Sequence, residues 1–465
     1  MIIKSVPSSW LIEEEHRLDC GPFVKGSIEA RKTLENLQYD KQFLVDLTLN
    51  GINGIYHVGQ EKIIWAKDKA HGMPFLRSGC ILKSDLSYQP YISRKQVVGN
   101  SLFQCPEGTT LISRSGSIGR MVYMRKDMED FAISQDVLKV VPDSKKIKPG
   151  YLYALLNSRY GVPIVTGGTF GSIIVHIEAE NIATLPVPRL GKVEAEVDQL
   201  INRAAMLREE ASEMILGSIQ QLQNEANLPN HIENHGSTFD FNVVSSNEIG
   251  SRLDGFFHSE YHTSAIKSVN NSRYGSHRVL DIAKSIVEPK RFKRVQVEPS
   301  ETSIPFFGTT SLLWLTPKPI YHLAGNQKNI NDYIVSRNTI LIPRSGQLTG
   351  LIGSAILPYG EIVGGAVSED AIRINCNNEI DAGFLYIALS SEYGRKQLKA
   401  RAYGSSIPHL DVNQVGLVNV PVLPNEIKKV IGKSGLNATL KRDEAIHLEE
   451  QAISLVEKAI KAGGS

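Results

Sequence analysis

Two segments look like parts of nucleotide-hydrolysing sites, and each lacks what that chemistry needs. Gly432-Lys433-Ser434 matches the end of a phosphate-binding loop, G-x-x-x-x-G-K-S, but Ile427 stands where the first glycine should be. Residues 443–447 (DEAIH) resemble a helicase box, yet the surrounding pattern is that of a helix and no buried strand precedes them. The sequence therefore predicts no nucleotide hydrolysis at either place.

The sequence also lacks convincing signatures of metal binding and of group-transfer enzymes. His231 and His235 are four residues apart, but they lie in a stretch rich in Pro, Asn and Gly with no third ligand nearby. Residues 167–171 (GGTFG) are glycine-rich, whereas the related residues 401–404 (RAYG) keep only the last glycine. No amino-methyltransferase signature, glycine-rich Rossmann loop or nuclease carboxylate cluster is found. We expect this chain to hold no metal or cofactor and to catalyse no reaction alone.

Basic and aromatic side chains remain as candidates for binding. Residues 290–294 (KRFKR) place four cations around one aromatic ring, and an aromatic and basic group lies at residues 88–95. Arginine and lysine contact phosphates, and arginine reads guanine in the major groove. The predicted DNA-binding residues are Tyr88, Arg94, Lys95, Arg114, Arg120, Lys290, Arg291, Lys293, Arg294 and Arg344. The alternative is that these are solvated surface charges, or that Arg114 and Arg344 are structural because both halves of the chain share them.

The elements that must position these residues are repeated along the chain. Residues 111–116 (LISRSG) return as 341–346 (LIPRSG), and residues 150–155 (GYLYAL) return as 383–388 (GFLYIA). Shorter matches keep the same order: 17–19 with 252–254, 74–75 with 305–306, 134–136 with 368–370, 158–161 with 391–394, 170–172 with 403–405, and 187–188 with 420–421. The sequence therefore predicts two copies of one unit.

Each copy ends in a long helix. Apolar and small residues of the segment 191–226 fall at alternating steps of four and three, which is typical of a coiled-coil seam, and such a helix would be roughly 55 Å long. The segment 425–462 has the same pattern, so we expect the two helices to pair. The alternative is that each helix lies alone on its own domain. The preceding parts mix short β-branched segments with helical ones, such as residues 149–157 and 381–391.

Size and composition set the remaining limits. A chain of 465 residues is too long for one core, and a formal net charge of +2 gives no basic field over the whole molecule. The four cysteines form no C-x-x-C pair, and no run of 18 apolar residues or signal peptide is present. We expect a cytoplasmic protein with no membrane partner.

Taken together, these motifs resemble the specificity (S) subunit of type I restriction-modification systems. The resemblance rests on two tandem units, each with an R-L-D opening, an L-I-x-R-S-G turn, an S-x-D element, a G-Y/F-L-Y helix and a V-P exit into a long helix. It implies an α+β fold with target recognition domains at residues 1–190 and 236–424. The long helices, 191–235 with a linker and 425–465, would form an antiparallel, pseudo-twofold coiled-coil spacer.

The same resemblance implies the partners. These are double-stranded DNA, read as an asymmetric bipartite site with one half per unit, and two methyltransferase subunits that use S-adenosylmethionine, usually on adenine. A full complex adds a motor-nuclease subunit. We expect methyltransferase docking to fall mainly on the long helices. Their outward faces are predicted to carry Glu194, Arg203, Arg208, Glu209, Lys441, Arg442 and Glu449. Any solvated helix would show such charges, so no single docking residue is assigned.

Two other classes of function stay open. One is an interaction scaffold of a related phage-defence assembly, and the other is an enzyme with a diverged active site. One feature departs from the family. Many members divide one helical segment between their termini, whereas this chain starts almost directly on a globular unit and ends on a whole helix.

Overall fold

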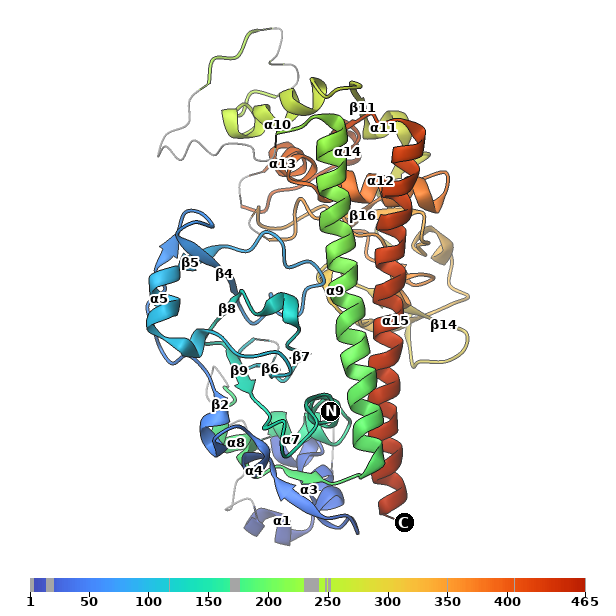
Figure 1. The fold of residues 1–465 in the computed structure, drawn as a ribbon. Coiled ribbons are helices and arrows are strands. Elements are labelled where there is room, and N and C mark those ends of the chain that lie inside the picture. Colours follow the sequence, from blue (N-terminus) through green and yellow to red (C-terminus); the bar gives the residue numbers. More distant parts are fainter. Residues whose placement is uncertain are drawn as a thin grey trace. The chain divides into compact units, whose positions relative to one another are not determined.

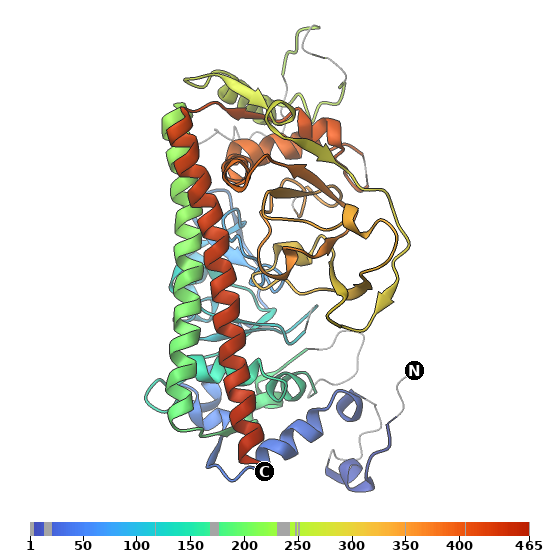
Figure 2. The same ribbon diagram turned by 90° about the vertical axis from the view of Figure 1, so that its right-hand side faces the viewer.

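The structure, a computed structural model, describes residues 4–13, 21–116, 118–167, 176–229, 242–246, 249, 252–348, 350–404 and 406–464. The chain divides into two compact units, each of which mixes helices and sheets (Figures 1 and 2). Unit 1 contains residues 1–209 and 444–465, and unit 2 contains residues 210–443. The repeated segments 17–19, 170–172 and residue 405 lie outside the described residues, as do His231 and His235.

Unit 1 contains two four-stranded sheets and a two-stranded pair. One sheet has the order β2-β9-β6-β7, made of Ile55–Tyr56, Val137–Val140, Thr110–Ser113 and Met121–Tyr123. The second has the order β3-β5-β4-β8, made of Trp65–Ala66, Tyr91–Ser93, Gly72–Leu76 and Ala132–Ile133, and its β4–β8 pair is parallel. The pair joins β1 (Lys41–Phe43) to β10 (Pro186–Pro188).

The helices of unit 1 lie between and after these strands. They are α1 (Ser8–Glu13), α2 (Gly21–Val24), α3 (Ser27–Glu35), α4 (Leu44–Leu47), α5 (Arg94–Gly99), α6 (Pro149–Leu156), α7 (Gly161–Gly167) and α8 (Ala179–Ala183). Short 3-10 turns occupy η1 (Gly51–Gly54), η2 (Ser101–Phe103) and η3 (Lys126–Met128).

Unit 2 repeats this topology. Its sheets have the orders β12-β18-β16, made of Ser285–Val287, Ala371–Asn375 and Thr339–Pro343, and β13-β15-β14-β17, made of Gln296–Val297, Tyr321–Ala324, Ser303–Phe307 and Ala366–Val367. The β14–β17 pair is parallel, as β4–β8 is in unit 1, and β11 (Ser276–Arg278) pairs with β19 (Asn419–Pro421). The isolated bridge between Leu341 and Ile356 stands where β6 pairs with β7. Two units with one strand order are what the sequence repeat predicts.

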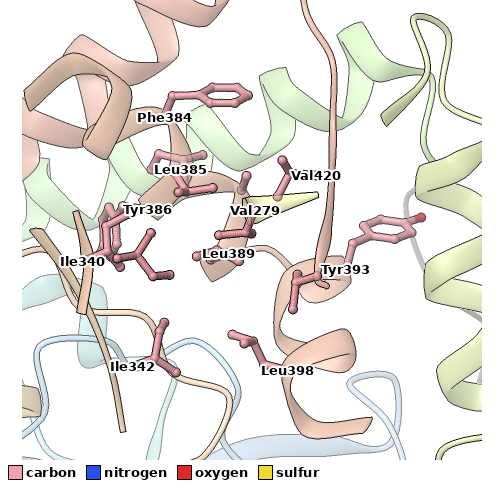
Figure 3. Packing of buried hydrophobic residues seen from close by; sticks show 14 of the residues in the cluster. Val279, Ile340, Ile342, Phe384, Leu385, Tyr386, Leu389, Tyr393, Leu398 and Val420 are labelled. Carbon is pink, nitrogen blue, oxygen red and sulfur yellow. The ribbon is translucent and has the colours of Figure 1, made fainter. Parts of the chain in front are cut away.

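The helices of unit 2 follow the same sequence of elements. They are α10 (Glu260–Asn270), α11 (Val279–Ile282), α12 (Glu379–Ser390), α13 (Glu392–Arg401) and α14 (Val412–Gly416), with 3-10 turns η4 (Ser311–Leu313), η5 (Ile330–Asp332) and η6 (Gly360–Ile362). Figure 3 shows the core that they enclose, where Leu385, Tyr386 and Leu389 of α12 lie near Ile340 and Ile342 of β16. This apolar cluster holds the sheet against the helices.

The repeated S-x-Y-G motif forms the same helix start in both units. The hydroxyl of Ser158 donates to the carbonyl of Leu155 at 2.6 Å and accepts from the N–H of Gly161 at 3.2 Å. Ser391 makes the equivalent bonds to Ala388 and Gly394, at the same two distances. A serine that satisfies one N–H and one carbonyl at a helix junction explains why this motif is shared.

A second shared glycine lets a short helix approach a long one. A Cβ on Gly383 would lie 2.1 Å from the carbonyl oxygen of Gly432, and one on Gly150 would lie 2.9 Å from Cα of Asp198. Such contacts are too short for any side chain, so only glycine allows the helix to pack this closely. The G-Y/F-L-Y motif therefore has a packing role in each unit.

The long helices are α9 (Lys192–Ala226) and α15 (Asn425–Gly463), and each unit contains half of both. In unit 1, Ala204 and Leu207 of α9 pack with Ala445 and Leu448 of α15. In unit 2, the hydroxyl of Ser218 donates to that of Ser434 at 2.7 Å. Early residues of α9 thus meet late residues of α15, so the two segments run antiparallel in each unit.

Several helix charges that we expected to face outward are buried instead. Glu194, Arg208, Arg442 and Glu449 are all less than 8 % exposed. Arg208 and Glu449 form an ion pair of 2.5 Å, and the hydroxyl of Tyr153 donates to the same carboxylate. These residues stabilise the packing of the helices, because a buried charge needs a partner. The prediction that these four charges lie on outward helix faces was wrong.

Among the described residues, no helix is long and apolar enough to span a membrane.

Candidate nucleic-acid interface

One sheet of each unit carries an excess of positive charge. We call β3-β5-β4-β8 the unit 1 basic sheet; residues 61–99, which contain β3, β4 and β5 and their connections, carry seven lysines and arginines and three carboxylates. The unit 2 basic sheet is β13-β15-β14-β17 with residues 289–333, and it carries six lysines and arginines and three carboxylates. Both segments are therefore locally basic, although the whole chain has a net charge of only +2.

In the unit 2 basic sheet, the side chain of Phe292 anchors residues 290–294, and the lysine and arginine side chains before and after it remain exposed to solvent. Phe292 stacks on Tyr333 with ring centroids 3.7 Å apart, and the hydroxyl of Tyr333 donates to the carbonyl of Lys290 at 2.6 Å. Lys290, Arg291 and Lys293 are exposed. Among the described residues, no hydrogen bond or ion pair of these three side chains is found. They are therefore available to an anionic ligand.

Arg294, the last residue of that run, is held differently. Its guanidinium donates to Glu369 at 2.6 Å and to the hydroxyl of Tyr321 at 3.3 Å, and it lies 4.7 Å from the ring centre of Phe306. Burial opposes the charged form, but the hydrogen bonds to Glu369 and Tyr321 raise the pKa of Arg294. The guanidinium of Arg294 is therefore charged and held in place beside the exposed cations.

In the unit 1 basic sheet, the predicted residues have unequal surroundings. Arg94 donates to the carbonyls of Lys69 and Gly72, at 3.2 and 2.9 Å, so its guanidinium helps to hold the β4 edge. Lys95 and Tyr88 are both exposed, and Tyr88 retains 47 % of its accessible surface. This group offers one cation and one aromatic face toward solvent.

Arg114, Arg120 and Arg344 lie at the other sheet of their units. Arg114 donates to the carbonyl of Ile177 at 3.0 Å and pairs with Glu178, and Arg344 pairs with Glu288 at 2.5 Å. Arg120 is half-buried, and burial lowers its pKa. The backbone N–H groups of Arg114 and Arg344 make the same bond, to the carbonyls of Asp136 and Asp370. These shared arginines have a structural role in both units, whatever else they contact.

One exposed residue was not predicted from the sequence. Trp65 on the edge strand β3 is 56 % exposed, and its ring meets Phe75 edge-on with centroids 5.9 Å apart. Lys62, Lys67 and Lys69 surround it in the sequence and are exposed as well. An exposed tryptophan among lysines is typical of surfaces that bind nucleic acids, since bases stack on aromatic rings. The run KIIWAKDK was the signal available in the sequence.

The segments that resembled catalytic motifs are parts of helix α15. A Cβ on Gly432 would lie 2.3 Å from the carbonyl oxygen of Ile380, so this glycine serves helix packing. Asp443 pairs with Arg337 at 2.5 Å and accepts from the N–H of Gly360. In the part of the chain that the structure describes, no cluster of three or more His, Cys, Asp or Glu residues could hold a metal.

Comparison with known proteins identifies this architecture. Residues 52–192 match the family model "Type I restriction modification DNA specificity domain". These residues of unit 1 are therefore similar to a type I restriction-modification DNA specificity domain. The matched segment of this specificity domain contains both four-stranded sheets of unit 1 and the entire unit 1 basic sheet. No sequence of a curated protein matches the chain.

Solved specificity subunits show weaker likeness. The S subunit of the type I system of M. genitalium is 15 % identical, with 92 % of this chain and 96 % of that chain covered and a TM-score of 0.32. The HsdS subunit of Thermoanaerobacter tengcongensis is 13 % identical, with coverages of 91 % and 97 % and a TM-score of 0.28. A chain from a study of complex assembly in the type I R-M system is 12 % identical, with coverages of 91 % and 97 % and a TM-score of 0.27.

Proposed function

We propose that this chain is the DNA-recognition subunit of a type I-like restriction-modification complex. It reads a bipartite DNA sequence, one half with each unit. The observation that carries the proposal is that a specificity domain in unit 1 has a topological copy in unit 2, and that each copy has a basic sheet with exposed cations. Phosphate contacts by such cations fix the register on DNA, and neighbouring side chains then read the bases.

The two halves of the site should differ in sequence. Unit 1 presents the exposed rings of Trp65 and Tyr88, whereas unit 2 presents the cationic side chains of Lys290, Arg291 and Lys293. Different side chains on two copies of one fold contact different base edges. The resulting recognition sequence is therefore asymmetric.

Catalysis belongs to companion subunits in this proposal. Two methyltransferase subunits bring S-adenosylmethionine and modify a base, and a motor-nuclease subunit joins the complete cytoplasmic complex. Their docking is supported by apolar side chains that the long helices expose: Met206 in unit 1, and Leu216, Val430 and Leu440 in unit 2, each between 42 % and 54 % exposed. Exposed apolar groups on paired helices are suited to a protein interface.

A salt titration of DNA binding tests the proposal. The purified chain, alone and with its methyltransferase subunits, is mixed with duplex DNA, and the retained fraction is measured at increasing salt concentration. A DNA reader loses affinity steeply with salt, because each phosphate contact releases counterions. Binding that is weak and independent of salt would contradict the proposal, whereas methyl transfer by this chain alone would contradict the assignment of catalysis to companions.

A further inference from the structure

Unit 2 contains a pocket directly beside its exposed cations. The cavity has a volume of about 330 Å³ and lies between the end of β14, the start of β15 and the turn that precedes β18. Arg294, the fixed member of the basic run, forms part of its wall. A cavity of this size falls within the range of small-ligand sites.

The walls of the pocket are aromatic and held in place. Phe306 and Tyr321 stack with ring centroids 4.9 Å apart and an interplanar angle of 6°, and Trp314 and Ile320 also line the cavity. Arg294 is fixed above Phe306 by its bonds to Glu369 and Tyr321. Phe306 is only 1 % exposed and supports the stack from behind, so the half-buried rings of Tyr321 and Trp314 are the ones that a flat aromatic ligand would contact.

One carboxylate in the pocket keeps its capacity to accept hydrogen bonds. The backbone of Asp370 is fixed, because its N–H donates to the hydroxyl of Ser368 at 3.2 Å and its carbonyl accepts from Arg344 at 2.9 Å. Among the described residues, the side-chain carboxylate of Asp370 has no hydrogen bond or ion pair. A ligand in this pocket would therefore meet a carboxylate acceptor on a fixed backbone, next to aromatic side chains.

We propose that this pocket receives an unstacked nucleobase with an exocyclic amino group, which is adenine, cytosine or guanine, from bound DNA. The inference rests on the proposed function. Three features support it: the rings of Tyr321 and Trp314 stack on the base, Asp370 accepts from its amino group, and Lys290, Arg291 and Lys293 attract the adjoining phosphates. Thymine has no amino group and could offer the carboxylate only its ring N3–H, which lies between two carbonyl oxygens that repel the carboxylate, so the pocket discriminates against it.

Single-stranded oligonucleotides test the pocket without knowledge of the target sequence. The full chain is titrated with labelled oligo(dC) and oligo(dT) of about 12 nucleotides, and binding is followed by fluorescence anisotropy. These two pyrimidines are alike in size and differ at the group that faces the carboxylate. We expect oligo(dC) to bind about tenfold more tightly, which corresponds to the discrimination of one good base contact.

The diagnostic variant is Asp370→Asn, which keeps the size of the side chain and its backbone bonds and adds a donor. In this variant, the ratio of the affinity for oligo(dC) to that for oligo(dT) should fall to about one or below one. Glu361→Gln, which removes the same charge from an exposed position of unit 2 outside residues 289–333, should leave the preference unchanged. Equal binding of both oligonucleotides to the unmodified chain, or a preference that Asp370→Asn leaves intact, would overturn the inference. Neither result touches the proposed function, which fails only if the complex selects no duplex sequence.

Discussion

Lys139 and Arg373 occupy the same position in the two units. Lys139 on β9 is paired across the sheet with Leu111 of β6, and Arg373 on β18 is paired with Leu341 of β16. Both side chains are buried, and burial lowers the pKa of Lys139 to about 8 and that of Arg373 to about 10. A buried cation at one site of a central strand is thus a shared feature of the repeat, but its surroundings differ.

Replacing Lys139 with methionine should stabilise unit 1. The ammonium lies 5.4 Å from the ring of Tyr56 and has no hydrogen-bond partner among the described residues. A pKa lowered from 10.5 to about 8 corresponds to a cost of roughly 3 kcal/mol for the charged form. We expect Lys139→Met to raise the free energy of unfolding by about 1–3 kcal/mol at pH 7, measured by urea denaturation.

The pH dependence of this gain has a definite sign. Between pH 8 and 10.5 the unfolded chain binds the proton that folded Lys139 has released, so the stability of the unmodified chain rises with pH in that window. The advantage of Lys139→Met should therefore shrink there. Arg373→Met is the control: Arg373 donates to three carbonyls, including those of Ser368 and Val367, so its removal should destabilise unit 2. A destabilising Lys139→Met would contradict the argument.

Removing one partner of the buried ion pair between Arg208 and Glu449 should destabilise the fold strongly. Replacing both residues with apolar ones should destabilise it little. Glu449→Leu leaves the guanidinium of Arg208 buried without its carboxylate and also removes the acceptor of Tyr153. We expect this single change to lower the free energy of unfolding by about 3–5 kcal/mol, and the double change Arg208→Met with Glu449→Leu to recover most of that loss.

The more exposed pair of Lys441 and Glu210 provides the comparison. Their side chains are 30 % and 36 % exposed, and Glu210→Gln should cost less than about 1 kcal/mol. Equal losses for the two pairs, or no recovery in the double variant, would show that burial does not set the energy of these contacts.

Gly383 should tolerate no side chain. An added Cβ would overlap the carbonyl of Gly432 on α15, so Gly383→Ala should separate α12 from the long helix and destabilise unit 2 by about 2 kcal/mol or more. Gly217 on α9 has open space around its Cα, and Gly217→Ala should stabilise the helix by about 0.5–1 kcal/mol. Thermal unfolding of both variants gives the comparison, and a harmless Gly383→Ala would mean that this helix contact is not close.

The exposed cations of unit 2 should supply phosphate contacts. Changing Lys290, Arg291 and Lys293 to alanine should weaken DNA binding and reduce the slope of log affinity against log salt by about 3, one for each lost contact. The same number of charges removed at Lys429, Lys433 and Lys458 of α15 should leave the slope unchanged. If both triple variants have the slope of the unmodified chain, the run 290–294 does not touch DNA.

The repeat could be read from the sequence because its motifs serve local geometry. Ser158 and Ser391 recur because a helix junction needs their hydroxyl, and Gly150 and Gly383 recur because a helix passes close to them. Such requirements leave fixed residue types at fixed spacing. The two units, their mixed sheets and the long helices were therefore predictable.

The partners of charged residues could not be predicted in the same way. Arg208 and Glu449 have the spacing of solvated helix charges, and only their contact across 241 residues of sequence buries them. Similarly, KRFKR does not reveal that Arg294 is bound by Glu369 while Lys293 is exposed. The role of a charge depends on the residues that the fold brings to it, and side chains distant in the sequence supply these.

Selection from a random duplex DNA library by this chain with its methyltransferase subunits tests the central claim most directly. Bound duplexes are recovered and sequenced. The account predicts two short, non-identical sequence elements separated by a fixed number of unspecified base pairs. Recovery of no common sequence, or of a single continuous element, would contradict the assignment of one half-site to each unit.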